Sequence, residues 1–352
     1  MATLAALAAQ QRASRARLEA DAAARLVTAY GRAWDAISRD LAALTRAIEA
    51  AQARGETVNT AWLARQSRYR ALMDQVETQI DGLAQQAGPL VRAQQAKAIA
   101  SSANHAEALA RAAFGPPPPG VAVTWDRVPV EATRELIGAL GDGRPLGELL
   151  ATFGPEARAA ADEALTTALV RGSSPRLAAQ ALEAAVQGLG RNRALRLARS
   201  SMLDAYRDST LAAYRQNDVI TAYKRIAAHG PRTCLACLAL DGKIYPLGQD
   251  FSRHASCRCA LVPVTKSWSD LGYPGIPEPA QPETGAAWFA RQPKTTQRAM
   301  LGSAFPYYER GQVTLNDFVE EINHPRWGAN VRQRPLRDVL AGIDAVAADA
   351  AD

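Results

Sequence analysis

The sequence is poor in aromatic residues, histidine and cysteine. Aromatic residues make up 6% of the 352 residues, and there are four histidines and four cysteines. So low an aromatic content fits a helix-rich protein packed with alanine better than a β-sandwich. A chain of this length is long enough for two or three domains with cores of their own.

The sequence also lacks a long apolar run. No uninterrupted apolar stretch approaches the roughly 18 residues that span a bilayer. The opening stretch 1–9 has no basic leading region and meets Gln10-Gln11-Arg12, which argues against a signal peptide. We therefore expect a soluble protein that is intracellular when made and has no membrane partner.

Enzyme signatures are missing as well. There is no Gly-x-Ser-x-Gly, no phosphate-binding Gly-rich loop with lysine, and no His-Glu-x-x-His. His229, together with Asp241 and Asp250, could form a hydrolytic metal site, although a hairpin turn also explains Asp241. We expect no enzyme, and the alternative is a zinc-containing nuclease or DNA-processing enzyme.

All four cysteines lie in one short stretch. Cys234 and Cys237 form a Cys-x2-Cys pair, sixteen residues follow, and His254-x2-Cys257-x-Cys259 closes the stretch. A Cys-x2-Cys turn supplies two thiolates, and a second arm that folds back completes a tetrahedron around Zn²⁺. The pattern therefore predicts a zinc site.

The ligand set stays open among five candidates. Cys234, Cys237 and Cys257 are the firmest, and His254 and Cys259 compete for the fourth place. A set of four protein ligands leaves no position for water, so the zinc would be structural. A disulfide, a redox pair and buried thiols are the alternatives; there is no secretory signal or βαβ pattern to favour the first two.

These motifs resemble the signature of phage Mu F-like head morphogenesis (minor capsid) proteins. The resemblance covers a little over a third of the chain and departs from the family at Arg253 and Ala255, where prolines usually flank the histidine. The stretches that carry it are 232–246, 254–263, 198–206 with its continuation to Tyr223, and 297–302.

The resemblance implies a structural protein of the virion. Such a protein acts in head morphogenesis, sits in the capsid interior near the portal, and passes through the host cytoplasm during assembly. The implied partners are the portal protein and capsid or scaffold proteins, with double-stranded DNA as a secondary hypothesis.

A basic run between residues 171 and 215 is the candidate contact with DNA. Arginine outnumbers lysine 36 to 5 in the chain, and a GC-rich genome explains that bias equally well. A solvated helix face is the alternative to phosphate contact. The candidate nucleic-acid-binding residues are Arg191, Arg193, Arg196 and Arg199.

The predicted fold is mostly α, with a small α+β domain clipped by zinc and a long N-terminal antiparallel helical hairpin. Apolar residues on a heptad, such as those from Tyr30 to Ile48, predict the hairpin. Its apolar seam should bury within a bundle or against a partner. The predicted domains are 1–114, the proline-rich linker 115–120, 121–264 (with a Mu F-like core at about 171–264), and a proline-rich arm at 265–352.

Local signals predict several boundaries. Thr60 is a candidate N-cap, Gly88-Pro89 should kink or end the second long helix, and Ser174 with Pro175 should start another. The predicted strands are 219–228, 243–245 and 260–264. The predicted helices of the arm are 286–303, 314–323 (with Thr314 as a cap) and 335–350.

Overall fold

The computed structural model is mostly helical, with two small sheets. It describes residues 3–126, 128, 130–140, 143–249, 257–324 and 328–349. None of the helices in this part of the chain is long and apolar enough to cross a membrane. The predicted class, mostly α with a small sheet, is confirmed.

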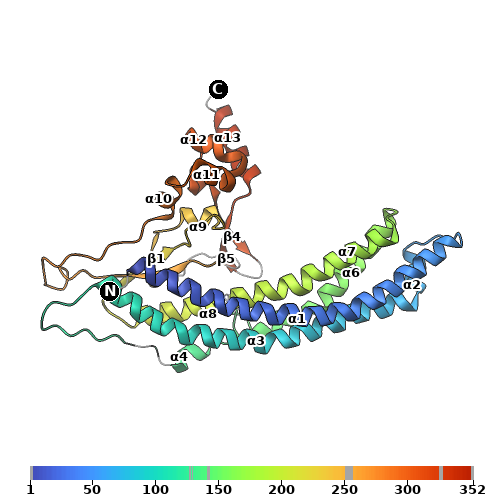
Figure 1. Ribbon diagram of the computed structural model, residues 1–352, viewed down its shortest axis with the longest axis horizontal. Helices are drawn as coiled ribbons and strands as arrows, with labels where there is room; N and C mark the ends of the chain where they lie inside the picture. Colours follow the sequence, from blue (N-terminus) through green and yellow to red (C-terminus); the bar gives the residue numbers. More distant parts are fainter. Residues whose placement is uncertain are drawn as a thin grey trace. The chain divides into compact units, whose positions relative to one another are not determined.

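The elements follow one another along the chain as shown in Figure 1. The helices are α1 (Leu4–Ala53), α2 (Thr60–Arg65), α3 (Ser67–Phe114), α4 (Val130–Arg134), α5 (Leu146–Leu150), α6 (Phe153–Val170), α7 (Pro175–Gln187), α8 (Arg193–Arg215), α9 (Leu235–Ala239), α10 (Gly285–Ala290), α11 (Lys294–Leu301), α12 (Phe305–Glu309) and α13 (Leu336–Asp349). The strands are β1 (Ile220–Ile226), β2 (Ile244–Pro246), β3 (Ala260–Thr265), β4 (Val319–His324) and β5 (Gly328–Gln333).

The chain divides into two compact units. Each unit combines stretches that are far apart in the sequence, whereas the predicted domains are continuous. Unit 1 consists of Met1–Ala16, Ala98–Leu136 and Leu203–Asp352, and unit 2 consists of Arg17–Lys97 and Ile137–Met202. Three of the four boundaries fall inside α1, α3 and α8, and the fourth, after Leu136, lies between α4 and α5.

The long helices α1 and α3 are antiparallel within unit 2. Arg32 donates to Gln86 over 3.3 Å, and Gln94 donates to Asp21 over 3.0 Å. Residue numbers therefore increase along one helix as they decrease along the other. The heptad seam predicted for the first helix is buried: Ile37 and Leu44 are 0% exposed. Of the two expectations for this seam, burial within the chain is the one observed.

Of the two boundaries predicted in this region, the cap at Thr60 is wrong, and Gly88-Pro89, predicted to kink or end a helix, does not end it. The N-cap of α2 is Asn59, whose side chain accepts from the N–H of Trp62, and Thr60 is the first helical residue. Pro89 does not end the second long helix, because α3 continues through it to Phe114. A proline inside a helix costs about 3 kcal/mol, which the burial of Ala87 and Val91 beside it can offset.

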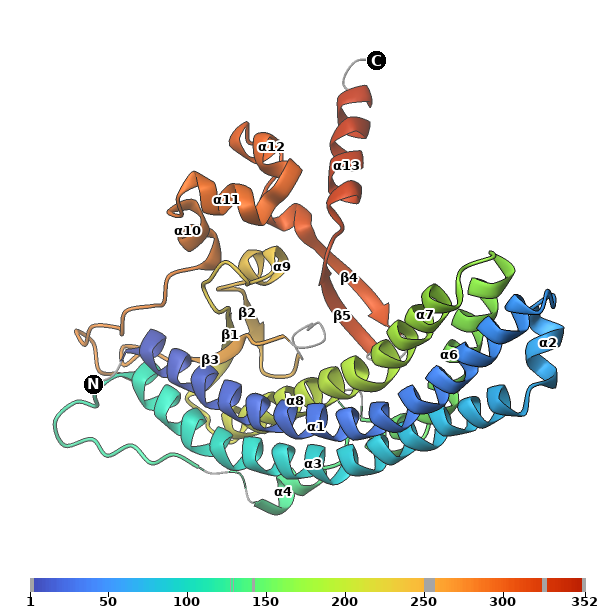
Figure 2. The same ribbon diagram turned by 45° about the vertical axis from the view of Figure 1, so that its right-hand side comes forward.

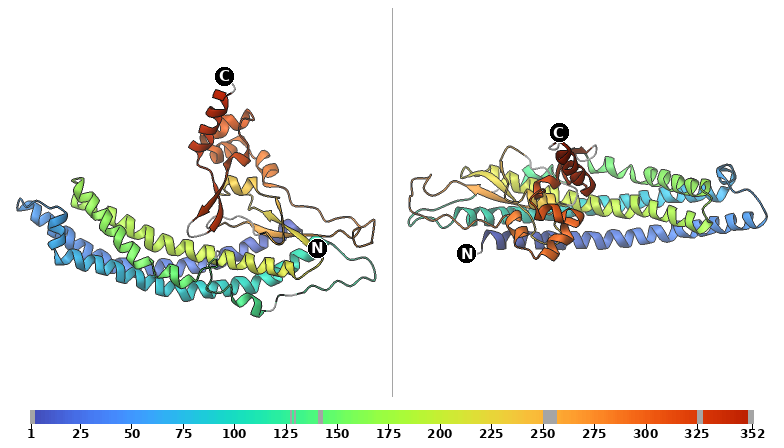
Figure 3. Two further views of the ribbon diagram at one scale, coloured as in Figure 1. Left: turned by 180° about the vertical axis from the view of Figure 1, so that it is seen from behind. Right: turned by 90° about the horizontal axis from the view of Figure 1, so that it is seen from above.

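In unit 2, α6 and α7 form a helical hairpin, coloured green in Figure 3. Ser174 caps α7 by accepting from the N–H of Leu177, and Pro175 opens the helix, as predicted. Gly154 at the start of α6 donates its N–H to Asp81 of α3 over 3.1 Å. A Cβ at this glycine would overlap the same carboxylate, so the helix can approach only without a side chain here.

Unit 1 contains a three-stranded antiparallel sheet in the order β2-β1-β3, visible in Figure 2. The three strands coincide with those predicted. Lys224 of β1 pairs with Ile244 on one side and with Val262 on the other. The first turns of α1 and the last turns of α3 pack on the sheet, in a cluster that includes Leu4, Leu109 and Ile226.

The C-terminal part of unit 1 packs on the short helix α9. Leu235 and Leu238 of α9 share a core with Phe289, Phe305 and further apolar residues of the last hundred residues. The expected helix at 314–323 is wrong: Thr314 caps a short 3-10 turn (Leu315–Phe318), and the hairpin β4–β5 follows. The apolar residues Val319 and Ile322 are three positions apart, which is a helical spacing, so the pairing with β5 rather than the local pattern selects the strand.

Candidate metal centre

The cysteines lie on α9 and on the segment that leads into β3. Cys234 caps α9, and Cys237 lies within that helix. The N–H of Cys237 donates to Sγ of Cys234 over 3.3 Å, which holds the Cys234 side chain at the start of the helix. Cys257 and Cys259 directly precede β3, so the pairing of β3 with β1 brings the second arm to the first.

Three of the sulfurs form a tight, buried group. The Sγ atoms of Cys237, Cys257 and Cys259 all lie within 4.8 Å of one another, and those of Cys237 and Cys257 are 4.0 Å apart. Zn–S bonds of about 2.3 Å in a tetrahedron place sulfurs about 3.8 Å apart. A disulfide would need about 2.05 Å, and all four thiols are free. These residues therefore fit a metal ion.

Cys234 adjoins the group, and its thiol is a hydrogen-bonding partner of the Cys237 thiol. It is half-buried, whereas the other three cysteines are buried. His254, the fifth candidate ligand, lies outside the described residues. The structure thus brings the Cys234–Cys237 arm and the Cys257–Cys259 arm together. The identity of the fourth metal ligand stays a prediction.

The thiols share protons among themselves. Hydrogen bonds from Cys237 and Cys259, followed by the charges of Arg207 and Arg225, lower the pKa of Cys257 below its ordinary value. Hydrogen bonds to the neighbouring sulfurs raise the pKa of Cys237. A group that shares protons in this way can release them together when a metal binds.

Three buried arginines surround the second cysteine arm, and each comes from a different element. Arg15 of α1 donates to the carbonyl oxygens of Cys259 and Arg258 over 3.4 and 3.3 Å. Arg207 of α8 donates to the carbonyl of Cys257. Arg225 of β1 donates instead to the sulfurs of Cys237 and Cys257. None of the three is more than 2% exposed.

These arginines were not identified from the sequence. Arg207 belongs to the basic run, whose excess charge indicates exposed phosphate contacts as readily as buried contacts. Arg225 lies two residues after Tyr223, so strand alternation puts both on the same face. The sequence signal that could have identified Arg225 is its position: a charged residue on the buried face of a predicted strand, close to a cysteine pair.

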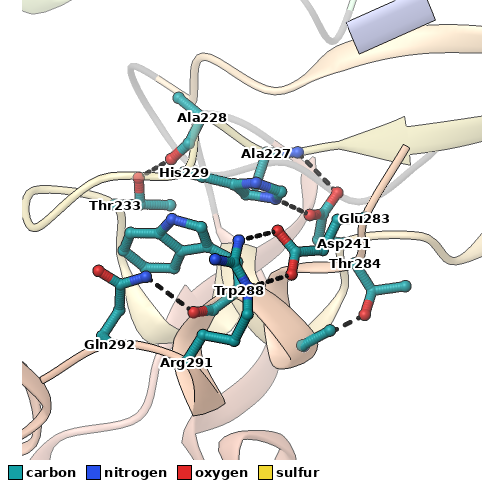
Figure 4. Close-up of polar contacts among 11 residues, drawn as sticks. Ala227, Ala228, His229, Thr233, Asp241, Glu283, Thr284, Trp288, Arg291 and Gln292 are labelled. Carbon is teal, nitrogen blue, oxygen red and sulfur yellow. Dashed lines mark hydrogen bonds and ion pairs between the residues drawn. The ribbon is translucent and has the colours of Figure 1, made fainter.

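Figure 4 shows a second polar cluster, around His229 and Asp241. His229 lines the same pocket as Cys234. Asp241 has a fully buried carboxylate, which accepts the N–H of Ala227 over 2.8 Å and lies 2.5 Å from Nε2 of His229. The ring of Trp288 stacks on His229 with centroids 5.6 Å apart. Asp241 is therefore more than a turn residue, while Asp250 lies outside the described residues.

The candidate DNA-binding arginines have different surroundings. Arg193 is buried and pairs with Glu156 over 2.8 Å, and Arg199 pairs with Glu19. Arg191 is half-buried, and Arg196 is exposed. These four residues do not form one exposed row, and their role in binding DNA stays a prediction.

Comparison with known proteins found one family. The model of the family described as Phage Mu protein F like protein matches residues 160–262, less than a third of the chain. No curated protein and no solved structure matches the chain. The matched stretch runs from α6 to β3 and contains all four cysteines. Residues 160–262 therefore form a phage Mu F-like region, as the cysteine motifs predicted.

Proposed function

We propose that the protein is a structural component of a phage head that acts in head morphogenesis. The match of residues 160–262 to the Mu F-like family carries this proposal. The buried group of three cysteines supports it, because a fourth protein ligand would close the metal to water, and a closed set shapes a fold rather than a reaction.

The metal is proposed to be one structural Zn²⁺ per chain. Cys237, Cys257 and Cys259 would hold it, with Cys234 or His254 completing the tetrahedron. The freshly reduced, folded protein should contain about one equivalent of zinc by elemental analysis. A folded protein that contains no zinc and takes up none on addition would contradict the proposal.

The proposed partners are the portal protein and capsid or scaffold proteins of the same phage. The heptad seam of α1 is covered within the chain, so a partner would contact other surfaces. Immobilised protein should capture the purified portal protein and leave an unrelated ring-shaped oligomer in solution. No capture from low to physiological salt would argue against portal binding.

Contact with packaged DNA is proposed as a secondary role. Arg196 is the exposed member of the four candidates, so it offers the clearest test. Arg196→Gln should weaken binding to duplexes of any sequence and reduce the salt dependence by about one phosphate contact. Arg193→Gln would be a poor test, because the residue is buried in an ion pair. An unchanged salt slope in Arg196→Gln would exclude this residue from DNA contact.

A nuclease is the competing function, and one observation favours it. The pair of His229 and Asp241 has the form of an oriented general base, and His229 lines a pocket of about 400 Å³ with Cys234 and Arg232. If the nuclease hypothesis is correct, the protein should cut DNA with added Mg²⁺ or Mn²⁺, and His229→Ala should abolish cleavage. Absence of cleavage with either ion would remove this alternative.

A further inference from the structure

We propose that Arg225 is a positioning residue of the metal centre: its buried guanidinium holds the cysteine sulfurs in place and balances their negative charge when a metal is bound. The inference rests on the proposed metal site. It concerns a residue outside the predicted ligand set and assigns it a role distinct from that of the other buried arginines.

The geometry of Arg225 supports this role. Arg225 lies on the central strand β1 and is 0% exposed. Its Nη2 lies 3.1 Å from Sγ of Cys237 and 3.5 Å from Sγ of Cys257, within the range of N–H···S hydrogen bonds. Its side chain also hydrogen-bonds to Cys259. One guanidinium thus reaches sulfurs from both arms.

The charge balance points the same way. A guanidinium without access to water needs an anion nearby, because burial of a lone charge is strongly unfavourable. The groups that Arg225 meets at hydrogen-bond distance are the sulfurs of Cys237 and Cys257. When a metal binds, the cysteine thiolates would supply the negative charge that this buried cation needs.

The surrounding acids have other partners. The carboxylate of Asp204 pairs with Arg207 over 3.1 Å, and that of Asp241 binds Ala227 and His229. Arg225 therefore faces sulfur, while nearby carboxylates are engaged with other groups.

Tyr245 of β2 orients the guanidinium. The phenol oxygen of Tyr245 accepts a hydrogen bond from Arg225, and the Tyr245 ring stacks on Tyr223 with centroids 5.3 Å apart. The pairing of β1 with β2 places Tyr223 opposite Tyr245, so the sheet itself fixes this arrangement. Arg225 is held in position before any metal arrives.

Arg225 differs in role from Arg15 and Arg207. Those two donate to the backbone carbonyls of residues 257–259 and so hold the course of the chain. Arg225 donates to the sulfurs, where a hydrogen bond withdraws electron density from a metal thiolate. Groups that hydrogen-bond to metal ligands typically contribute roughly ten- to a hundredfold to metal affinity.

The test replaces zinc with Co²⁺ in the full-length chain, because thiolate-to-cobalt charge-transfer bands report directly on the sulfurs. Arg225→Met removes the charge and the donors with little change in length. It should lose roughly ten- to a hundredfold in Co²⁺ affinity, measured by chelator competition, and shift the charge-transfer bands. Arg225→Lys keeps the charge and should recover part of the affinity.

Arg193→Met is the matched control, because Arg193 is also a buried, paired arginine but belongs to unit 2. It should leave both affinity and bands unchanged. If the wild type binds neither Co²⁺ nor Zn²⁺, the proposed metal site is wrong. If the wild type binds and Arg225→Met has wild-type affinity and bands, the role of Arg225 is wrong.

Tyr245→Phe provides a second test in case Arg225→Met does not fold. It removes only the hydroxyl that orients Arg225, so it should fold and show a smaller loss of affinity with a shift of the bands in the same direction. If Arg225→Met does not fold, unchanged affinity and bands in both Tyr245→Phe and Arg225→Lys would overturn the inference.

Discussion

At the scale of single residues, His105 shows how burial changes a titration. Its Nδ1 lies 2.9 Å from the hydroxyl of Tyr206, and burial, followed by the charge of Arg15, lowers its pKa. In the unfolded chain the pKa returns to about 6.5. As the pH falls through that value, the unfolded chain binds the proton first, so the folded state loses stability.

We therefore expect the wild type to lose more unfolding free energy than His105→Gln between about pH 7.5 and about pH 5.5. Chemical denaturation at both pH values measures the difference. Both proteins carry the same cysteines, so the pH dependence of metal binding cancels in the comparison. Equal losses would mean that His105 titrates normally in the folded protein.

Gly285, the first residue of α10, is a site where any side chain should be harmful. A Cβ there would lie 2.5 Å from the carbonyl oxygen of Leu238 and 2.9 Å from its Cα. Because both neighbours are backbone atoms, Gly285→Ala should lower the free energy of unfolding by about 1–3 kcal/mol. Urea denaturation measures the change.

Gly82 within α3 provides the opposite case. A Cβ at Gly82 meets nothing within 4 Å, so Gly82→Ala should stabilise the protein by up to about 1 kcal/mol through helix propensity.

The outcome that would contradict the Gly285 prediction is a Gly285→Ala protein as stable as the wild type. It would show that α10 can move away from α9 without cost.

The sequence predicts the site only in part at this scale. Cysteine spacing identifies the residues that the structure brings together, because short loops and a strand pairing suffice to join them. Arg15 cannot be found in this way. It lies 244 residues before Cys259, and no local pattern in the sequence shows which distant side chain supports a loop.

At the scale of elements, α9 carries two different interfaces. Cys237 belongs to the core around Tyr223 and the other cysteines, whereas Leu235 and Leu238 belong to the C-terminal core. A helix of five residues is not stable alone. Metal binding on one side and C-terminal packing on the other should therefore stabilise each other.

If the proposed metal is bound, its removal with a chelator should accelerate amide hydrogen exchange in α9 and in α10 to α12. The hairpin of α6 and α7 in unit 2 is the internal reference and should be unaffected. Exchange in α10 to α12 that does not respond to chelation would show that the two interfaces are independent.

The coupling should also act in reverse. Leu238→Ala removes a fully buried side chain from the C-terminal core, so it should cost about 2–5 kcal/mol and weaken metal binding. Leu165→Ala in α6 removes a leucine that is 1% exposed in unit 2, and it should destabilise the protein without changing metal affinity. Equal metal affinity in both variants would contradict the coupling.

Local sequence signals predict most elements but not all. Ser174-Pro175 and the β-branched strand 220–226 were found because their chemistry favours one conformation. The β4–β5 hairpin was missed because a cap at Thr314 precedes it, and a cap alone does not distinguish a full helix from one short turn. In α3, tertiary packing prevails over the local preference of Pro89.

At the scale of the whole molecule, the Mu F-like region is not self-contained. Leu4 and Ala8 of α1, with Leu109 and Ala113 of α3, pack in one core cluster with β1 and β3. All four of these residues lie outside the matched stretch 160–262. Sequence periodicity cannot predict such long-range packing, because an apolar seam does not indicate which element it packs against.

A fragment of residues 160–262 should therefore fail to fold even with zinc present. It should lack near-UV circular dichroism and a cooperative thermal transition, while the full-length chain shows both. A fragment that unfolds cooperatively would mean that the segments of α1 and α3 only cover the sheet.

The packing of α1 on the sheet also has a consequence for synthesis. The ribosome makes Leu4 more than 200 residues before Val262, yet both belong to one core cluster. Until β3 emerges, the start of the chain has no sheet to dock on, so the nascent protein exposes apolar surface for most of translation. Delayed closure of this kind makes chaperone protection valuable while each copy is being made.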